Sequence, residues 1–184
     1  MGTRIEVIEA DITSLSVDAV VNAANSTLLG GGGVDGAIHR VAGPRLREDC
    51  GALGGCRTGD AKVTSGHDLR ARCVIHTVGP VWKGGEAGEA VLLASCYRRC
   101  FEIAAERQFA SIAFPAISAG AYGYPLQDAT QIAAVQTRNH LERGSDLDRI
   151  VFACFGEEVR EVYLATFEDI FGPNLFSTDI PGTP

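Results

Sequence analysis

Apolar and polar residues alternate along several short stretches of the chain, as they do in strands that bury one face. Residues 3–9 show this alternation, with Ile5 and Val7 between polar neighbours. Other short apolar runs are bounded by turn residues and are typical of strands buried on both faces. The predicted strands are residues 3–9, 19–22, 61–64, 73–78, 111–115 and 149–154.

Elsewhere, apolar residues recur every three or four positions, which marks one face of a helix. Leu93, Cys96, Cys100 and Ile103 follow this spacing and are expected in the core. The predicted helices are residues 36–41, 89–107, 127–141 and 159–170. Strands that alternate with helices predict an α/β fold with a largely parallel sheet. The first three strands have little predicted helix between them, so we expect a mixed sheet.

Ligands of open α/β sheets bind beyond the carboxyl ends of the strands. Four segments follow predicted strands in this way, and we expect them to form the binding site. They are residues 11–12, 22–36, 118–124 and 155–156.

Length and composition favour one globular domain. The chain has 184 residues, of which 46% are hydrophobic, and a formal net charge of −7. We expect a domain over residues 1–171 and a flexible, proline-containing tail over residues 172–184. An acidic chain with only two lysines and scattered arginines repels nucleic-acid phosphates, so general nucleic-acid binding is not expected.

Targeting and metal signals are weak. The N-terminus lacks the pattern of a signal peptide and no apolar run reaches the ~20 residues that span a bilayer, so we expect a cytoplasmic protein without a membrane partner. The six cysteines and four histidines show no zinc-binding spacing. Neither a metal nor another cofactor is expected.

Residues 30–39, GGGGVDGAIH, place a glycine run before a predicted helix. Glycines let successive N–H groups converge on an anion, and a helix N-terminus adds partial positive charge. The run contains G-x-G-x-x-G, but it does not follow the first strand. The next predicted strand ends near residues 64–65, and Asp68 after it lies too far along to be the acid expected about 20 residues on, so a Rossmann site is disfavoured. A P-loop is excluded because Gly-Lys-[Ser/Thr] is missing. A phosphate cradle and a flexible loop fit the run equally well.

A second glycine-bearing loop favours the cradle. Residues 114–125, FPAISAGAYGYP, also follow a predicted strand and precede a predicted helix. Two such loops can hold a diphosphate from opposite sides. Each residue also fits a plain turn in which Tyr122 and Tyr124 pack as aromatics.

Asp35 stands near the start of the predicted helix and allows two interpretations. Aspartate at a helix start commonly caps it. A bound diphosphate would instead favour the protonated form of Asp35, and the helix N-terminus its ionised form. A carboxylate between these influences can serve as a general base.

Four motifs together resemble macrodomains of the MacroD type, the bacterial O-acetyl-ADP-ribose deacetylases and mono-ADP-ribosyl hydrolases. They are NAAN (22–25), GGGGVDGAIH (30–39), IHTVGPVW (75–82) and FPAISAGAYGYP (114–125), and the resemblance extends over residues 3–171. It implies a three-layer α/β/α domain with a mixed, mostly parallel sheet. It also implies an ester hydrolase that binds ADP-ribose and O-acetyl-ADP-ribose, and that removes mono-ADP-ribose from acidic side chains of modified proteins.

The resemblance also assigns roles to residues. Asp11 and Ile12 would contact the adenine, although Asp11 also fits a turn or cap, and Phe155 would cover the adenine or else lie in the core. Asn25 and Asp35 would be catalytic, with Asp35 directing water and Asn25 holding the water or a ribose hydroxyl. The loops around the diphosphate and distal ribose would be Gly31, Gly32, Gly33 and Val34 on one side, and Ser118, Ala119, Gly120, Ala121 and Tyr122 on the other.

Three neighbouring polar residues are expected outside the chemistry. Asn22 should support the loop backbone, His76 should be a hydrogen-bonded core histidine, and His39 a surface or core histidine that could reach Asp35. The chain departs from the family at Ala10, at Ala119 and in the glycine-rich segment 51–59, which could alter the cleft rim. A non-catalytic module that reads ADP-ribose remains the alternative to an enzyme.

Overall fold

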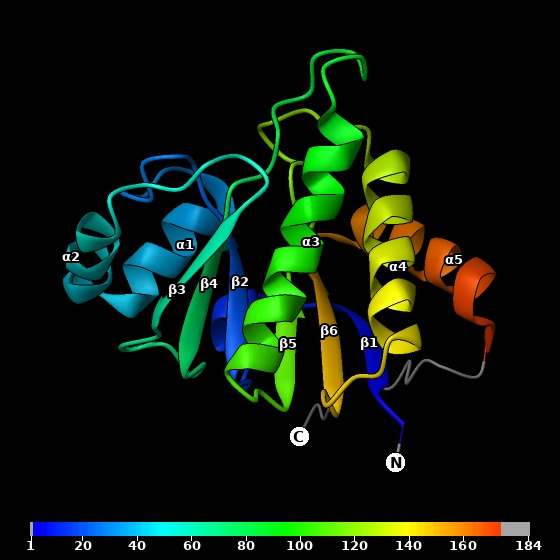
Figure 1. Cartoon of the computed structure of the whole chain (residues 1–184), viewed down its shortest axis with the longest axis horizontal. Coiled ribbons are helices and arrows are strands. Elements are labelled where there is room, and N and C mark those ends of the chain that lie inside the picture. Colours follow the sequence, from blue (N-terminus) through cyan, green and yellow to red (C-terminus); the bar gives the residue numbers. More distant parts are fainter. Residues whose placement is uncertain (1, 174–184) are drawn as a thin grey trace.

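The computed structural model describes residues 2–173 and arranges them around one six-stranded sheet (Figure 1). Every predicted strand is present. The strands are β1 (Arg4–Glu9), β2 (Ala19–Ala23), β3 (Ala61–Ser65), β4 (Cys73–Thr77), β5 (Ser111–Phe114) and β6 (Arg149–Cys154). The helices are α1 (Gly33–Ala42), α2 (Pro44–Leu53), α3 (Glu89–Glu106), α4 (Leu126–Glu142) and α5 (Glu157–Phe171), with a short 3-10 helix, η1, at Ile12–Ser14.

The strand order is β1-β6-β5-β2-β4-β3, and every neighbouring pair is parallel except β3 with β4. The prediction of a mixed, mostly parallel sheet is therefore confirmed. The expectation of little helix between the first three strands was wrong, because α1 and α2 lie between β2 and β3. The antiparallel strand is instead β3, at the edge of the sheet, where Ala61 pairs with Thr77.

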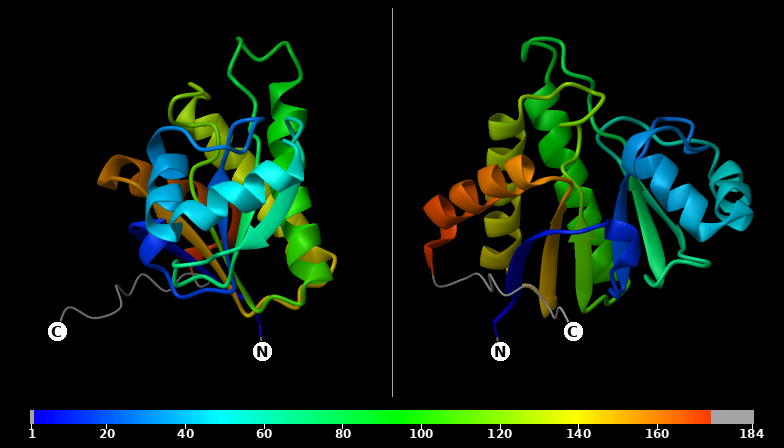
Figure 2. Two further views of the ribbon diagram at one scale, coloured as in Figure 1. Left: turned by 90° about the vertical axis from the view of Figure 1, so that its left-hand side faces the viewer. Right: turned by 180° about the vertical axis from the view of Figure 1, so that it is seen from behind.

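Different helices cover the two faces of the sheet, which gives the predicted three layers. Side chains of a strand alternate between faces, so Val20 and Val21 enter opposite cores. The core around Val20 contains residues of α1, α2 and η1, and the core around Val21 contains residues of α3, α4 and α5. Helices α3 and α4 lie in front of the sheet in Figure 1, and the reverse view in Figure 2 brings α1 forward.

Within residues 2–173, α2 is the one α-helix that the sequence analysis missed. Pro44 begins it, and Gly54 ends it in the left-handed conformation with φ of 69°. Leu46 and Cys50 are fully buried on its inner face. Because α2 includes the start of the glycine-rich segment 51–59, that segment is partly helical, and none of its residues lines the cleft described below.

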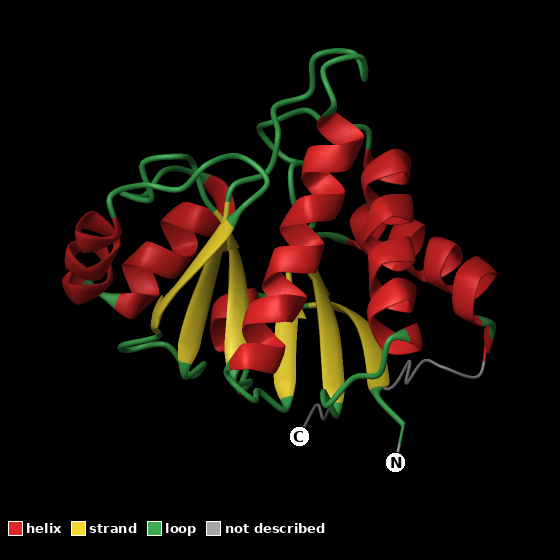
Figure 3. Ribbon diagram, in the orientation of Figure 1, coloured by secondary structure: helices red, strands yellow, loops and turns green. Residues whose placement is uncertain are grey.

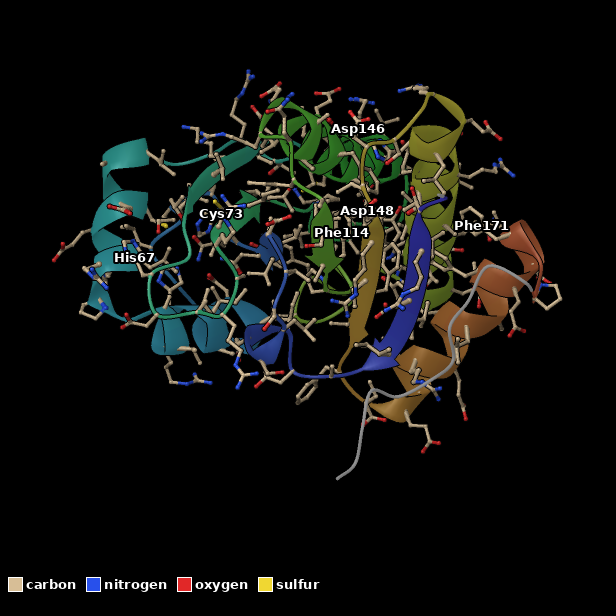
Figure 4. The ribbon with its side chains drawn as sticks, turned by 90° about the horizontal axis from the view of Figure 1, so that it is seen from below. His67, Cys73, Phe114, Asp146, Asp148 and Phe171 are labelled. Carbon is tan, nitrogen blue, oxygen red and sulfur yellow. The ribbon has the colours of Figure 1, made fainter. Side chains whose placement is uncertain are left out.

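Strands β2 and β5 are tied together at one end and separate at the other. The Asp18 carboxylate accepts hydrogen bonds from the backbone N–H groups of Ala110 (2.8 Å) and Ser111 (3.1 Å) at the amino ends. Figure 4 shows the molecule from the side of these amino ends, where Cys73 and Asp148 are labelled. Pairing of β2 with β5 stops at Val20 and Ala113, whereas β2 stays paired with β4 through Ala23.

This separation opens a crevice at the carboxyl ends. The chain leaves β2 for α1 on one face and leaves β5 for α4 on the other, as Figure 3 lets the reader follow. Such a change of face between adjacent strands is where open α/β sheets bind ligands. From residue 174 on, the tail expected over residues 172–184 lies outside the described residues. Within residues 2–173, no helix combines the length and hydropathy needed to cross a membrane.

Candidate functional site

A cleft of about 690 Å³ occupies the crevice. Every candidate residue from the sequence lines it except Gly31, which lines the adjacent groove. The candidates brought together are Asp11, Ile12, Asn25, Gly32, Gly33, Val34, Asp35, Ser118, Ala119, Gly120, Ala121, Tyr122 and Phe155.

The first loop presents free backbone donors to this cleft. Helix α1 starts at Gly33, earlier than predicted, and its N-cap Gly32 provides no side-chain cap. No described residue accepts a hydrogen bond from the N–H groups of Gly31 through Asp35. Gly36 packs so closely that a Cβ there would lie 2.6 Å from the Gly31 carbonyl oxygen, which fixes the glycine loop against α1.

The second loop lies opposite and is held by its ends. The backbone N–H of Trp82 donates to the Tyr122 carbonyl (2.8 Å), and that of Tyr124 donates to the Ser118 carbonyl (3.0 Å). The N–H groups of Gly120, Ala121 and Tyr122 have no acceptor among the described residues. Both loops therefore offer amide donors that an anion can satisfy.

Ser118 adopts an unusual conformation in this loop. Its φ is 64°, and its buried hydroxyl has no hydrogen-bond partner among the described residues. A Cβ at Gly79 would overlap this hydroxyl, so glycine is required there. Strain at a non-glycine residue is typical of functional sites.

Asp35 is almost fully buried, at 4% exposure, and does not cap the helix. It is the third residue of α1. Its Oδ1 accepts a hydrogen bond from Asn22 Nδ2 (2.8 Å) and lies 3.4 Å from His39 Nε2. Its Oδ2 lies close to Gly31, where an added Cβ would be 3.1 Å away. The cap interpretation is wrong, and His39 contacts Asp35 rather than standing apart.

Asn22 donates to Asp35 instead of supporting the loop backbone, which corrects the prediction. Its Nδ2 also lies 3.2 Å from His76 Nδ1. His76 is buried and hydrogen-bonded, as predicted, and its Nε2 lies 2.9 Å from Thr64 Oγ1. Burial, with a smaller contribution from His39, lowers the pKa of His76 to about 4, so the imidazole is neutral at physiological pH.

Asn25 is held by its own loop. Its Nδ2 donates to the Gly30 carbonyl (3.0 Å), and its Oδ1 accepts from the Thr27 N–H (3.1 Å) and hydroxyl (2.6 Å). An amide nitrogen carries two hydrogens, so one N–H of Asn25 is left for a ligand.

Asp11 and Phe155 stand at the other end of the cleft. One oxygen of Asp11 accepts from the Thr13 N–H (2.9 Å) and hydroxyl (2.7 Å), so Asp11 caps η1. The cap uses Oδ1 and leaves Oδ2 unused. Phe155 is 92% exposed, so its core interpretation is wrong. An aromatic ring exposed at a cleft edge can cover a planar group.

Several lining residues were missed by the sequence analysis. Arg40 is the one cationic side chain that lines the cleft within the described part of the chain. It shares a helix face with Val34 and Ala37 through spacing of three, a signal that would have identified it. Other missed residues lie at the carboxyl ends of strands, in the segments that follow them, or in the first turns of the next helices: Ala10, Ala23, Ala24, Gly79, Pro115, Ala116, Leu126, Ala153 and Val159.

Several known proteins are similar to this chain in sequence. Residues 21–133 match the family model of the Macro domain. A macro domain-containing protein of Chlorobaculum tepidum is 57% identical over 159 residues, which cover 86% of this chain and 92% of that relative. A Salmonella newport protein named O-acetyl-ADP-ribose deacetylase is 51% identical over 167 residues, covering 89% and 93%.

Solved structures show the same fold. The Oceanobacillus iheyensis macrodomain with ADP aligns with a TM-score of 0.84 and 38% identity, over 88% of each chain. The Trypanosoma brucei macrodomain in complex with ADP-ribose aligns with a TM-score of 0.83 and 47% identity, over 87% of this chain and 67% of that one. On the family model, the close relatives and the shared architecture, the chain belongs to the macro domain family.

Proposed function

We propose that the protein binds ADP-ribose and hydrolyses esters on its distal ribose. The proposed substrates are O-acetyl-ADP-ribose and mono-ADP-ribose attached to acidic protein side chains. The names of the Salmonella relatives support deacetylation, and the ligand of the Trypanosoma brucei structure supports ADP-ribose as the bound group.

The two amide-lined loops suit a diphosphate. Gly31 through Asp35 supply free N–H groups and a helix N-terminus, and Gly120 through Tyr122 supply donors from the opposite side. Backbone donors need no lysine, which fits a chain with only two. Because the loops are anchored to the sheet, a diphosphate held between them would present the neighbouring ribose in one orientation.

The observation that carries the proposal is the buried Asp35 carboxylate in the wall of this cleft. Asn22 engages Oδ1, so Oδ2 remains to accept a proton. In deacetylation, Asp35 would take a proton from water as the water oxygen bonds to the acetyl carbonyl carbon. The bond from that carbon to the ribose oxygen then breaks, the ribose oxygen takes up the proton, and ADP-ribose and acetate leave.

Asn25 is the second catalytic candidate. Its remaining N–H can hold the water or a ribose hydroxyl beside Asp35. At the adenine end, Asp11 Oδ2 can accept a hydrogen bond from the exocyclic amino group, and Phe155 can cover the ring.

A reader module without turnover is the second candidate, and the engagement of Asn25 favours it. Most of the Asn25 amide is used within its own loop, which supports a structural role. Incubation of the purified protein with O-acetyl-ADP-ribose, followed by chromatography of released ADP-ribose, separates the two. We expect turnover, and a loss of at least about 100-fold in Asp35→Ala. Binding by calorimetry without turnover would establish the reader instead.

A further inference from the structure

A continuous chain of buried polar groups connects the edge strand β3 to Asp35. Thr64 on β3 contacts His76 on β4, His76 contacts Asn22 on β2, and Asn22 contacts Asp35 on α1. Thr64 is 9% exposed, and Asn22 and His76 are fully buried. None of Asn22, His76 and Thr64 lines the cleft, so these three side chains cannot touch a ligand there.

The hydrogens of this network can be assigned from Asp35 outward. A carboxylate oxygen accepts, so the Asn22 atom that lies 2.8 Å from Asp35 Oδ1 is the amide nitrogen. The same nitrogen lies 3.2 Å from His76 Nδ1, which therefore accepts from it. A neutral imidazole with an acceptor at Nδ1 carries its hydrogen on Nε2, which lies 2.9 Å from Thr64 Oγ1 and 3.6 Å from Cys50 Sγ.

The two contacts of Asn22 Nδ2 agree with this orientation of the amide. One N–H of Nδ2 meets His76 Nδ1, and the other meets Asp35 Oδ1. A flipped amide would set its oxygen against the Asp35 carboxylate, which is repulsive. The unflipped amide leaves Asn22 Oδ1 buried without a partner in the described part of the chain. An unpartnered buried oxygen costs about 1–3 kcal/mol, so the arrangement is not the one that best satisfies Asn22 itself.

We propose that Thr64, His76 and Asn22 form a positioning relay, which holds Asp35 by Oδ1 so that Oδ2 faces the reacting water. The relay rests on the proposed ester hydrolysis, and its members are positioning residues. Neutral His76 is essential, because a hydrogen on Nδ1 would oppose the Asn22 N–H. The relay would also explain why Asp35 keeps one orientation without a capping role.

A pair of threonine substitutions distinguishes a role in positioning Asp35 from a role in the stability of the fold. Thr64→Val removes the oxygen acceptor of His76 Nε2–H, and Thr64 itself does not line the cleft. Thr137→Val is the matched control, because Thr137 is buried and its hydroxyl donates to the Ala133 carbonyl (2.8 Å) on α4, away from the relay. Thr64→Ser retains the hydroxyl and should restore the wild-type rate.

We expect kcat on O-acetyl-ADP-ribose to fall about tenfold or more in Thr64→Val, since loss of alignment near 1 Å can cost about 100-fold. Calorimetry should give an ADP-ribose Kd within about twofold of wild type. Asn22→Asp, which cannot donate to Asp35, should lower kcat further with a similar Kd. Equal kcat values in Thr64→Val and Thr137→Val, after correction for the folded fraction, would overturn the relay.

An activity-independent measurement distinguishes failure of the relay from failure of the proposed function. The ¹⁵N chemical shifts of His76 should show a neutral ring with hydrogen on Nε2 in the wild type, and a change in tautomer population in Thr64→Val. A wild-type protein with no turnover but with this signature would refute the hydrolase and retain the relay geometry. Hydrogen on Nδ1 in the wild type would refute the relay whatever the activity.

Discussion

The Gly31→Ala substitution would displace the Asp35 side chain and leave its carboxylate in place as a functional group. A Cβ at Gly31 would lie 3.1 Å from Asp35 Oδ2 and 3.5 Å from Asn25 Nδ2. The first distance is shorter than an ordinary carbon–oxygen contact, so the carboxylate must shift by a few tenths of an ångström. The backbone itself can accept alanine, because Gly31 is not among the residues with positive φ.

The expected loss follows from the size of this shift. A misplacement of 1 Å can cost about 100-fold in rate, so a shift of about 0.3–0.5 Å corresponds to a loss of about four- to tenfold in kcat. That loss equals about 0.8–1.4 kcal/mol of transition-state stabilisation. The ADP-ribose Kd should change little, since the diphosphate donors are backbone N–H groups that alanine retains.

Steady-state kinetics on O-acetyl-ADP-ribose and calorimetry with ADP-ribose test this expectation. Gly32→Ala is the matched control, because a Cβ there meets no atom within 4 Å and its extended backbone (φ −95°, ψ −175°) suits alanine. Gly32 lines the cleft, so any loss in that variant should appear in KM. An unchanged kcat in Gly31→Ala, or equal losses of kcat in both variants, would show that Asp35 Oδ2 takes no part in the reaction.

Three further predictions concern residues that line or support the cleft. Gly36→Ala would place a Cβ 2.6 Å from the Gly31 carbonyl oxygen, so the backbone must move. We expect the unfolding free energy, measured by chemical denaturation, to fall by about 1–3 kcal/mol, and ADP-ribose binding to weaken. Phe155→Ala should leave the melting temperature unchanged, since the ring is 92% exposed, but should weaken ADP-ribose binding about tenfold or more by calorimetry if the ring stacks on adenine. Because burial lowers the pKa of His76 from 6.5 to about 4, the unfolded chain binds the additional proton between these values. The unfolding free energy should therefore fall by about 3 kcal/mol as pH drops from 6.5 to 4, and His76→Gln should flatten this part of the profile.

Local patterns were sufficient to predict the strands and both loops. Apolar runs identify strands at whatever position they occupy in the sheet, and glycines after a strand identify a loop that can bind anions. Helix α2 was missed although Leu46 and Cys50 have helical spacing. Its charged residues and the glycines around its end obscured an apolar face of only two buried residues.

The surroundings of Asp35 could not be predicted from local patterns. Asn22 and Asp35 are separated by 13 positions, and Asn22 meets His76 because strand pairing sets them side by side in the register of β2 and β4. That register depends on the whole sheet. The spacing of Asp35 and His39 by one helical turn was visible in the sequence, but the burial that makes their contact matter was not.

The location of the ribose relative to Asp35 tests the account most directly. A crystal structure of the protein soaked with ADP-ribose should show the diphosphate between residues 31–34 and 118–122, with Asp35 Oδ2 facing the distal ribose across one water. A distal ribose turned away from Asp35, or a diphosphate that bypasses either loop, would contradict the account.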